Sequence, residues 1–152
     1  MEFAERPAGH SANETRNGQA NHMRLKLIMP VVEAEEYVKP EECRHSCGGK
    51  EFWLRQEVKK QVRDTHDEEV RVRRYECLNC RRRFRVYPQG VSQDRFSERV
   101  KGMAVMLSLL GLSYGAGVLM LEGLGLWIGK TTVYEVVQAA AERALGWWGK
   151  EP

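Results

Sequence analysis

Two closely spaced cysteine pairs are the residues of this sequence best suited to chemistry. Three residues separate Cys43 from Cys47, two separate Cys77 from Cys80, and 29 residues lie between the pairs. Tetrahedral zinc takes four soft ligands, and two tight turns brought together by a hairpin supply them. The spacing therefore predicts a structural Zn²⁺ site of four thiolates, which leaves no open position for a substrate water.

Three alternatives to this site stay open at the level of sequence. The thiols are free or joined in disulfides, the metal is catalytic, or His45 replaces one thiolate as a ligand. A thioredoxin-like redox role for Cys77 and Cys80 is disfavoured because such pairs lie in a βαβ context, and no such pattern surrounds them. No N-terminal segment resembles a secretion signal, and close-spaced cysteines in a reducing cytoplasm are more often metal ligands than disulfides.

Positive charge is concentrated in one block that includes the second cysteine pair. The whole chain has a net charge of +3, but residues 71–101 hold ten Lys or Arg against three Asp or Glu. We expect Arg81, Arg82, Arg83 and Arg85, which follow the pair, to contact phosphate groups. On an extended strand Arg82 would lie opposite the other three. Further candidates for phosphate contact are Arg71, Arg73, Arg74, Arg95 and Arg99.

The elements that must position these residues change character near residue 90. Residues 52–62 and 70–76 have β-like patterns, and a third strand follows around 84–87. This β-rich unit has little apolar material of its own, so we expect a metal to hold it together.

Three helices are predicted after residue 90. They cover 92–110, with Ser92 as N-cap, 114–123, with Ser113 as N-cap, and 130–145. A capped helix, a glycine-containing turn and a second helix are typical of a helix-turn-helix. The predicted fold class is α+β, a small antiparallel β zinc ribbon followed by a three-helix helix-turn-helix domain. The expected divisions are a disordered tail at 1–22, an N-terminal arm at 23–42, the ribbon at 43–90, the helical domain at 91–146 and a tail at 147–152.

The third predicted helix has two contrasting faces. Helical spacing places Val133, Val136, Val137 and Ala140 on an inward side. Other positions of this helix carry groups that can read base edges or contact phosphate, which makes them candidate DNA contacts. They are Lys130, Thr131, Thr132, Tyr134, Glu135 and Gln138. A plain three-helix bundle with a polar outer face is the alternative.

The first predicted helix is unusually apolar for so small a bundle. Its inward face comprises Val100, Met103, Ala104, Leu107 and Leu110, whereas Val105, Met106 and Leu109 lie elsewhere. Exposed apolar area of this kind marks a partner surface, unless the zinc module covers the helix. A membrane span over 103–121 is disfavoured because Gly111 and Ser113 interrupt it and Glu122 follows it.

The order of these parts resembles the N-terminal region of bacterial insertion-sequence transposases. The matching pieces are CLNCRRRFRVYPQGVS at 77–92, the segment 97–116, and KTTVY at 130–134, within a resemblance that covers about 40–145. The resemblance implies that ribbon and helix-turn-helix together recognise terminal inverted repeats in double-stranded DNA. It also implies a cytoplasmic, nucleoid-associated protein.

In that family an RNase H-like catalytic domain with three acidic metal ligands follows. After residue 102 the acidic residues of this sequence are only Glu122, Glu135, Glu142 and Glu151, and no βαβ pattern surrounds them. We therefore expect no enzyme activity from this chain. Helix 97–110 with Trp147 and Trp148 is expected to meet a second copy of the chain or the absent catalytic domain. A zinc-ribbon module for protein interaction or transcriptional regulation is the alternative function.

Overall fold

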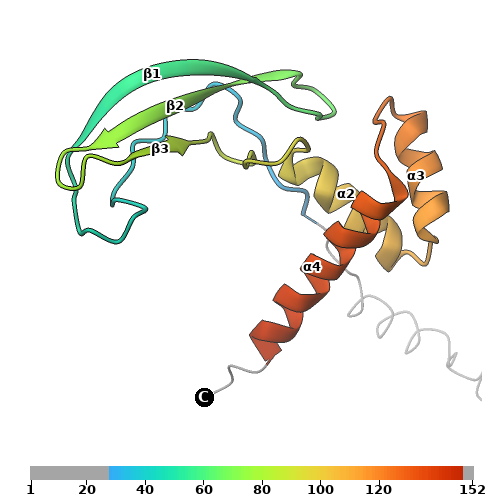
Figure 1. Ribbon diagram of the computed structural model, residues 1–152. Helices are drawn as coiled ribbons and strands as arrows, with labels where there is room; N and C mark the ends of the chain where they lie inside the picture. Colours follow the sequence, from blue (N-terminus) through green and yellow to red (C-terminus); the bar gives the residue numbers. More distant parts are fainter. Residues whose placement is uncertain (1–27, 149–152) are drawn as a thin grey trace, which may run out of the picture.

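Within the residues that the structure describes, a three-stranded sheet lies at one end of the molecule and three helices lie at the other (Figure 1). The computed structural model describes residues 28–148. The strands are β1 (Phe52–Gln61), β2 (Glu69–Cys77) and β3 (Arg83–Val86), and the helices are α2 (Glu98–Leu109), α3 (Tyr114–Gly123) and α4 (Lys130–Trp148). The expected α+β class is thus confirmed. The expected tail at 1–22, part of the arm, and the last residues of the C-terminal tail lie outside the described residues, as do the side chains of Trp147 and Trp148.

The sheet is antiparallel in the order β1-β2-β3. One face is covered at one end of the sheet, and the opposite face is covered at the other end. Successive side chains of a strand point to opposite faces. Val70 and Val72 of β2 pack against Val32 and Val62 on one face, which we call the Arg74 face because Arg74 shares it. Tyr75 and Cys77 face the other way, which we call the Tyr75 face. Their cluster includes Cys43, Phe84 and Val86.

The first helix begins later than the sequence predicts. The sequence favours Ser92 as its N-cap, but α2 begins at Glu98 and the Ser97 side chain accepts a hydrogen bond from the Val100 backbone N–H. Residues before Ser97 pair with the end of the sheet instead. Arg63 forms a parallel bridge with Phe96, donates its N–H to the Arg95 carbonyl at 2.8 Å, and accepts from the Ser97 N–H at 3.1 Å. Tertiary pairing thus replaces the first helical turn.

The other helix boundaries agree closely with the sequence prediction. Ser113 caps α3 by accepting from the Ala116 N–H, and α4 begins at Lys130. Gly111 and Gly125, which end the first two helices, adopt φ of 88° and 80°, where a side chain would add strain. Helix α4 continues to Trp148, and its C-terminal half extends beyond the other two helices (Figure 1).

The helical core confirms most of the predicted inward positions. Val100, Ala104, Leu107 and Val133 are buried in one cluster, with Val136, Val137 and Met103 packed against it. Leu110, predicted to point inward, is 64% exposed, because α2 ends at Leu109 and the chain turns away there. In the described part of the chain no helix is long and apolar enough to cross a membrane.

The N-terminal arm runs from the helices to the sheet and covers part of α2. A groove beside α2 is lined by Ile28, Met29 and Pro30, and a Cβ at Gly102 would lie 3.0 Å from the Pro30 ring. Farther along, the Glu33 N–H donates to the Gln89 carbonyl at 3.1 Å. The arm, rather than the cysteine-containing module, therefore lies on this apolar side of α2.

A buried carboxylate joins the β1–β2 turn to the start of α2. The Asp64 side chain has no exposed surface and lies 3.0 Å from the Arg99 guanidinium. It accepts hydrogen bonds from the Ser97 hydroxyl at 2.5 Å and from the backbone N–H groups of His66 and Asp67. Burial raises the pKa of Asp64, but the donors and Arg99 outweigh burial and hold this pKa below its usual value.

Candidate metal centre and basic sheet face

The four cysteines converge at the outer end of the Tyr75 face. All four are free, and their Sγ atoms lie within 4.8 Å of one another. The Sγ atoms of Cys43 and Cys80 are 3.7 Å apart, and those of Cys47 and Cys77 are 3.5 Å apart. Tetrahedral ligation with Zn–S bonds of ~2.3 Å separates sulfurs by about 3.8 Å, whereas a disulfide needs about 2.05 Å. The cluster can therefore hold a metal ion.

Two glycines allow the loop that holds Cys43 and Cys47 to turn tightly around the sulfurs. Gly48 has a φ of 69°, and a Cβ on Gly49 would lie 2.6 Å from the Cys77 sulfur and 3.2 Å from the Cys47 sulfur. Only a hydrogen atom fits there. The Cys43 N–H donates to the Gly49 carbonyl at 2.9 Å, and the Asn79 amide donates to the Cys47 carbonyl at 2.9 Å.

The pKa values of Cys43 and Cys47 are shifted in opposite directions by backbone donors, burial and neighbouring thiols. The Gly49 backbone N–H and the adjacent thiols lower the pKa of Cys47 to about 6. For Cys43 the His45 backbone N–H lowers the pKa, but burial and the three neighbouring thiols prevail and raise it to about 12. A divalent cation would favour the thiolate form of all four, as expected of metal ligands.

The His45 side chain lies outside this group of sulfurs. Its Nε2 is 3.4 Å from the Arg83 carbonyl oxygen, and its ring meets Phe84 edge-on. Its backbone N–H, in contrast, points at the Cys43 sulfur at 3.5 Å. The thiols alone form the ligand cluster, which favours the four-cysteine prediction over the alternative with His45.

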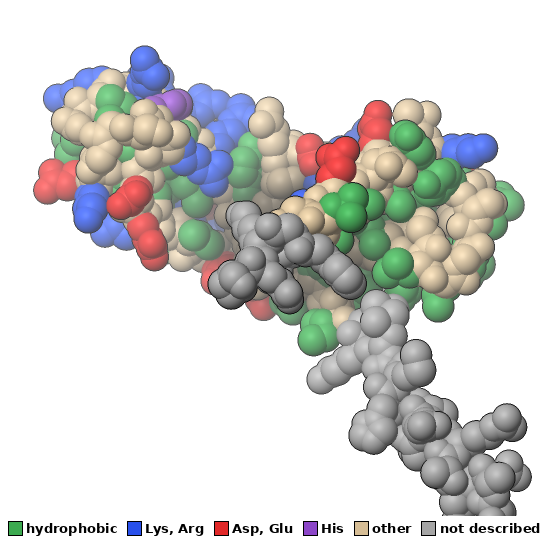
Figure 2. All heavy atoms as spheres, turned by 90° about the horizontal axis from the view of Figure 1, so that it is seen from below, with side chains coloured by type: hydrophobic (Ala, Val, Ile, Leu, Met, Phe, Trp, Pro, Cys, Tyr) green, Lys and Arg blue, Asp and Glu red, His purple; other side chains and the backbone are tan. Residues whose placement is uncertain are grey.

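The Arg74 face of the sheet carries most of the basic groups beside this cluster. Register pairs Arg74 with Arg85 and Glu76 with Arg83, so these four side chains share one face. A β-bulge after Leu54 adds Arg55, whose guanidinium binds the Glu76 carboxylate at 2.9 and 3.0 Å and lies 5.0 Å from the Trp53 ring centroid. Figure 2 shows Lys and Arg gathered over the sheet end and apolar side chains over the helical end.

Glu76 is the shared anion of this face. Besides Arg55 it binds Arg83 at 3.2 Å and lies 3.9 Å from Arg81. The hydrogen bond from Arg55 is the main reason that the pKa of Glu76 lies below its usual value. One carboxylate thus orients three guanidinium groups toward the same side of the sheet, just before Cys77 of the cysteine cluster.

The arginines expected to contact phosphate occupy different environments. Arg81 and Arg82 precede β3, and Arg81 has a φ of 57°, so these two do not continue the extended strand on which Arg83 and Arg85 lie. Arg83 and Arg85 are exposed on β3. Arg71 and Arg73 face the other way and pair with Glu57, and Arg99 is held by Asp64.

Helix α4 exposes most of its predicted DNA-contacting residues. Lys130, Thr131, Tyr134, Glu135 and Gln138 belong to this set, and the Tyr134 ring, 48% exposed, is held edge-on by Tyr114 at 5.5 Å. Thr132 is half-buried.

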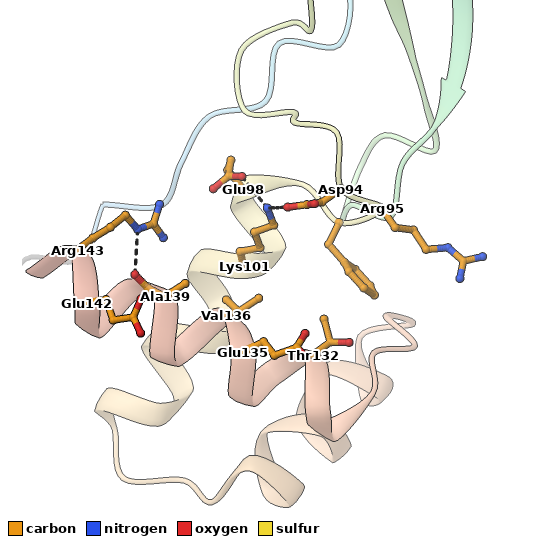
Figure 3. A pocket seen from close by; sticks show the side chains of 11 residues that line it. Asp94, Arg95, Glu98, Lys101, Thr132, Glu135, Val136, Ala139, Glu142 and Arg143 are labelled. Atoms are coloured by element: carbon orange, nitrogen blue, oxygen red, sulfur yellow. Dashed lines mark hydrogen bonds and ion pairs between the residues drawn. The ribbon is translucent and has the colours of Figure 1, made fainter.

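Thr132 and Glu135 point toward the segment that leads into α2 (Figure 3). The intervening groove has a volume of about 810 Å³ and is lined by four carboxylates, two of which Lys101 pairs with, at 2.5 Å from Asp94 and 2.9 Å from Glu98. Arg95 and Arg143 also line the groove, so it carries charges of both signs.

Three contributors to the site escape prediction from the sequence. The first is Gly49, because no pattern in the sequence shows that its hydrogen faces the sulfurs. Arg55 and Glu76 lie 21 positions apart, and only the bulge and the strand register bring them together. Their charges are evident in the sequence, but their pairing is not.

Comparison of the chain with protein-family models, curated proteins and solved structures gives no match.

Proposed function

We propose that this chain is the DNA-binding part of a transposase-like protein, with a zinc ribbon and a helix-turn-helix that together recognise terminal inverted repeats. In this proposal Zn²⁺ occupies the four-thiolate site in a structural role. Arg81, Arg82, Arg83 and Arg85 contact phosphates, and α4 enters the major groove after the turn that follows α3. The chain carries no strand-transfer activity of its own.

The basic Arg74 face is the observation that carries the proposal. Its guanidinium groups come from all three strands and are anchored next to the cysteine cluster, so a metal that fixes the turns also fixes the cations. Phosphate contacts supply much of the affinity for DNA, whereas base contacts supply sequence preference. The exposed hydroxyl, amide and carboxylate groups of α4 are of the type that reads bases.

A second candidate is a zinc-dependent protein-interaction module. It is favoured by large apolar side chains exposed on the helical end, among them Leu109, Leu119, Met120 and Trp127, which are 54–70% exposed. Such a module would bind DNA weakly and without salt dependence, and it would form stable complexes with a second copy or with another domain.

The test is selection of DNA by the purified, zinc-loaded protein from a pool of random duplexes, at two salt concentrations and with a chelated sample alongside. A recovered motif that is lost on chelation would support the proposal. Retention without a motif would leave a phosphate binder and reject recognition of inverted repeats. No retention at either salt concentration would reject the DNA function and favour the protein-interaction module.

Two variants separate phosphate contact from base reading. Gln138→Ala, on the exposed side of α4, is expected to alter the preferred sequence. Arg85→Ala, on β3, is expected to weaken binding equally across sequences and to reduce its salt dependence. The same change in preference for both variants would contradict the assigned roles.

A further inference from the structure

Arg74 and Arg85 form a cross-strand pair at the centre of the Arg74 face. They are direct partners in the β2–β3 register. Directly opposed residues of an antiparallel pair have Cβ atoms about 5 Å apart and point to the same side. Two guanidinium groups therefore project together from neighbouring strands, although like charges in this position repel each other.

Neither arginine is neutralised by the residues that the structure describes. Arg73, the neighbour of Arg74 in β2, pairs with Glu57 at 3.0 Å and lies over the Tyr37 ring. Arg83, two positions before Arg85, binds Glu76. Arg74 is half-buried, yet neither it nor Arg85 makes an ion pair or side-chain hydrogen bond within residues 28–148. Partial burial of an unpaired cation is unfavourable, so an anion bound here would be stabilising.

The two side chains open into a small pocket of suitable chemistry. The pocket has a volume of about 150 Å³. Its lining combines four cations with two polar and two apolar side chains: Arg74, Arg85, Lys59, Lys60, Tyr87, Gln93, Val58 and Val72. No carboxylate lines it. Among the described residues that are buried or half-buried, every fully buried side-chain nitrogen has a hydrogen-bond partner. Arg74 is half-buried and its guanidinium has no such partner within these residues, so the guanidinium nitrogens are in contact with solvent. Guanidinium groups bind phosphate oxygens through pairs of parallel hydrogen bonds.

We infer that Arg74 and Arg85 clamp one phosphate group, supplied by the backbone of duplex DNA. The inference rests on the proposed DNA-binding function. It singles out Arg74 from the further candidates for phosphate contact and gives it a partner and a defined pocket. A polymer backbone suits the site because a second hollow, lined by Arg74, Arg83 and Arg85, continues along β3. Successive phosphates of one strand can follow this row of cations.

The experiment measures binding of a fluorescently labelled duplex over a series of salt concentrations. It compares the full chain, zinc-loaded, with Arg74→Ala, Arg85→Ala and the double variant. A matched double control, Lys39→Ala with Lys50→Ala, removes equal charge at exposed positions outside the strands and helices. Zinc content and thermal unfolding verify that each variant folds.

If Arg74 and Arg85 hold one phosphate between them, removing either side chain should lose that one contact. The double variant should bind about tenfold more weakly, and its log–log salt slope should be shallower by about 0.9. Each single variant should show nearly the whole effect, because both side chains hold the same group. The control should retain the wild-type slope. Arg85 is exposed on an edge strand, so Arg85→Ala keeps the test available if Arg74→Ala fails to fold.

The outcomes separate the clamp from the general function. Equal slopes for the Arg74/Arg85 variant and the control, with wild-type binding intact, would overturn the clamp and leave the proposed function standing. If the wild-type protein binds no duplex, the proposed function fails, and titration with inorganic phosphate tests the pocket by NMR of the arginine Nε–H groups. Shifts at Arg74 and Arg85 but not at Arg71 would assign the pocket to free phosphate. Absence of shifts would overturn it altogether.

Discussion

Single residues decide whether the four thiols can meet around an ion. The ligand type follows from the cysteines themselves, but their spacing depends on the loop that holds Cys43 and Cys47. Gly49 lies at the closest approach of that loop to Cys77, where even a methyl group would contact sulfur. Residues that orient ligands typically change metal affinity by about 10- to 100-fold when altered.

We predict that Gly49→Ala weakens zinc binding by about 10- to 100-fold. The new Cβ would lie 3.0 Å from the Asn79 Cβ as well as 2.6 Å from the Cys77 sulfur, so the loop must move and spread the ligands. Competition with a chromophoric chelator measures the affinity. Gly115→Ala is the matched control, because a Cβ there meets nothing within 4 Å. Identical affinities for the two variants would refute the steric argument.

At the scale of elements, the β1–β2 turn and the start of α2 depend on one another. The chain segment before Ser97 is held by backbone hydrogen bonds to Arg63, and Ser97 both caps α2 and donates to Asp64. Asp64 thus accepts hydrogen bonds from the cap residue and from two backbone amides of the turn, and it also pairs with Arg99. A carboxylate with this many partners stabilises the junction only while it is ionised.

We predict that Asp64→Ala destabilises the protein by about 3 kcal/mol, because it leaves Arg99 and the Ser97 hydroxyl without their partner. Urea unfolding of the zinc-loaded protein measures the change. Glu68→Ala, at an exposed position of the same turn, should change the free energy of unfolding by no more than about 0.5 kcal/mol. Comparable losses from both variants would show that the turn, rather than the carboxylate network, matters.

The same carboxylate predicts a pH dependence. Its pKa is lowered in the folded protein, so ionised Asp64 contributes stability that is fully present above its unfolded pKa of about 3.9. That contribution is lost as the pH falls through the lower folded-state pKa. The difference in unfolding free energy between wild type and Asp64→Asn should be constant near neutral pH and shrink in this acidic range. Protonation of the cysteine ligands affects both proteins and cancels in the difference. A difference that grows on acidification would contradict the assignment.

At the scale of the whole molecule, the buried apolar side chains of residues 28–148 form three separate clusters. The helical cluster around Val100 and Leu121 shares no residue with the cluster that contains Cys43 and Cys77. The third cluster, around Val70 and Val72, shares no residue with either, although its members alternate along the chain with those of the cysteine cluster. A metal ion acts directly on only one of the three.

We predict that zinc removal loosens the cysteine end and leaves the helices folded. Hydrogen exchange after chelation should show faster exchange in residues 43–50 and 75–86, while amides of α2, α3 and α4 retain their protection. Restoring zinc should reverse the change. Simultaneous loss of protection in the helices would show instead that sheet and helices unfold as one unit.

The sequence by itself determined which four cysteines could share a metal, the coarse α+β class and most element boundaries. Cysteine spacing, the alternation of apolar and charged residues, and capping serines such as Ser113 are local signals, and they act within a few residues. For the same reason the inward positions of α4 followed from helical spacing alone. The concentration of positive charge in residues 71–101 is likewise a property of the amino-acid order.

Only the tertiary structure decided where that charge acts. Arg73 and Arg74 are neighbours with identical chemistry, yet strand alternation and register give Glu57 to one and Arg85 to the other. The start of α2 lies at Ser97 rather than Ser92 because pairing with Arg63 outweighs the local preference for a helix. Pairing across a sheet joins residues far apart in the chain, so its outcome depends on register and bulges that no local pattern encodes.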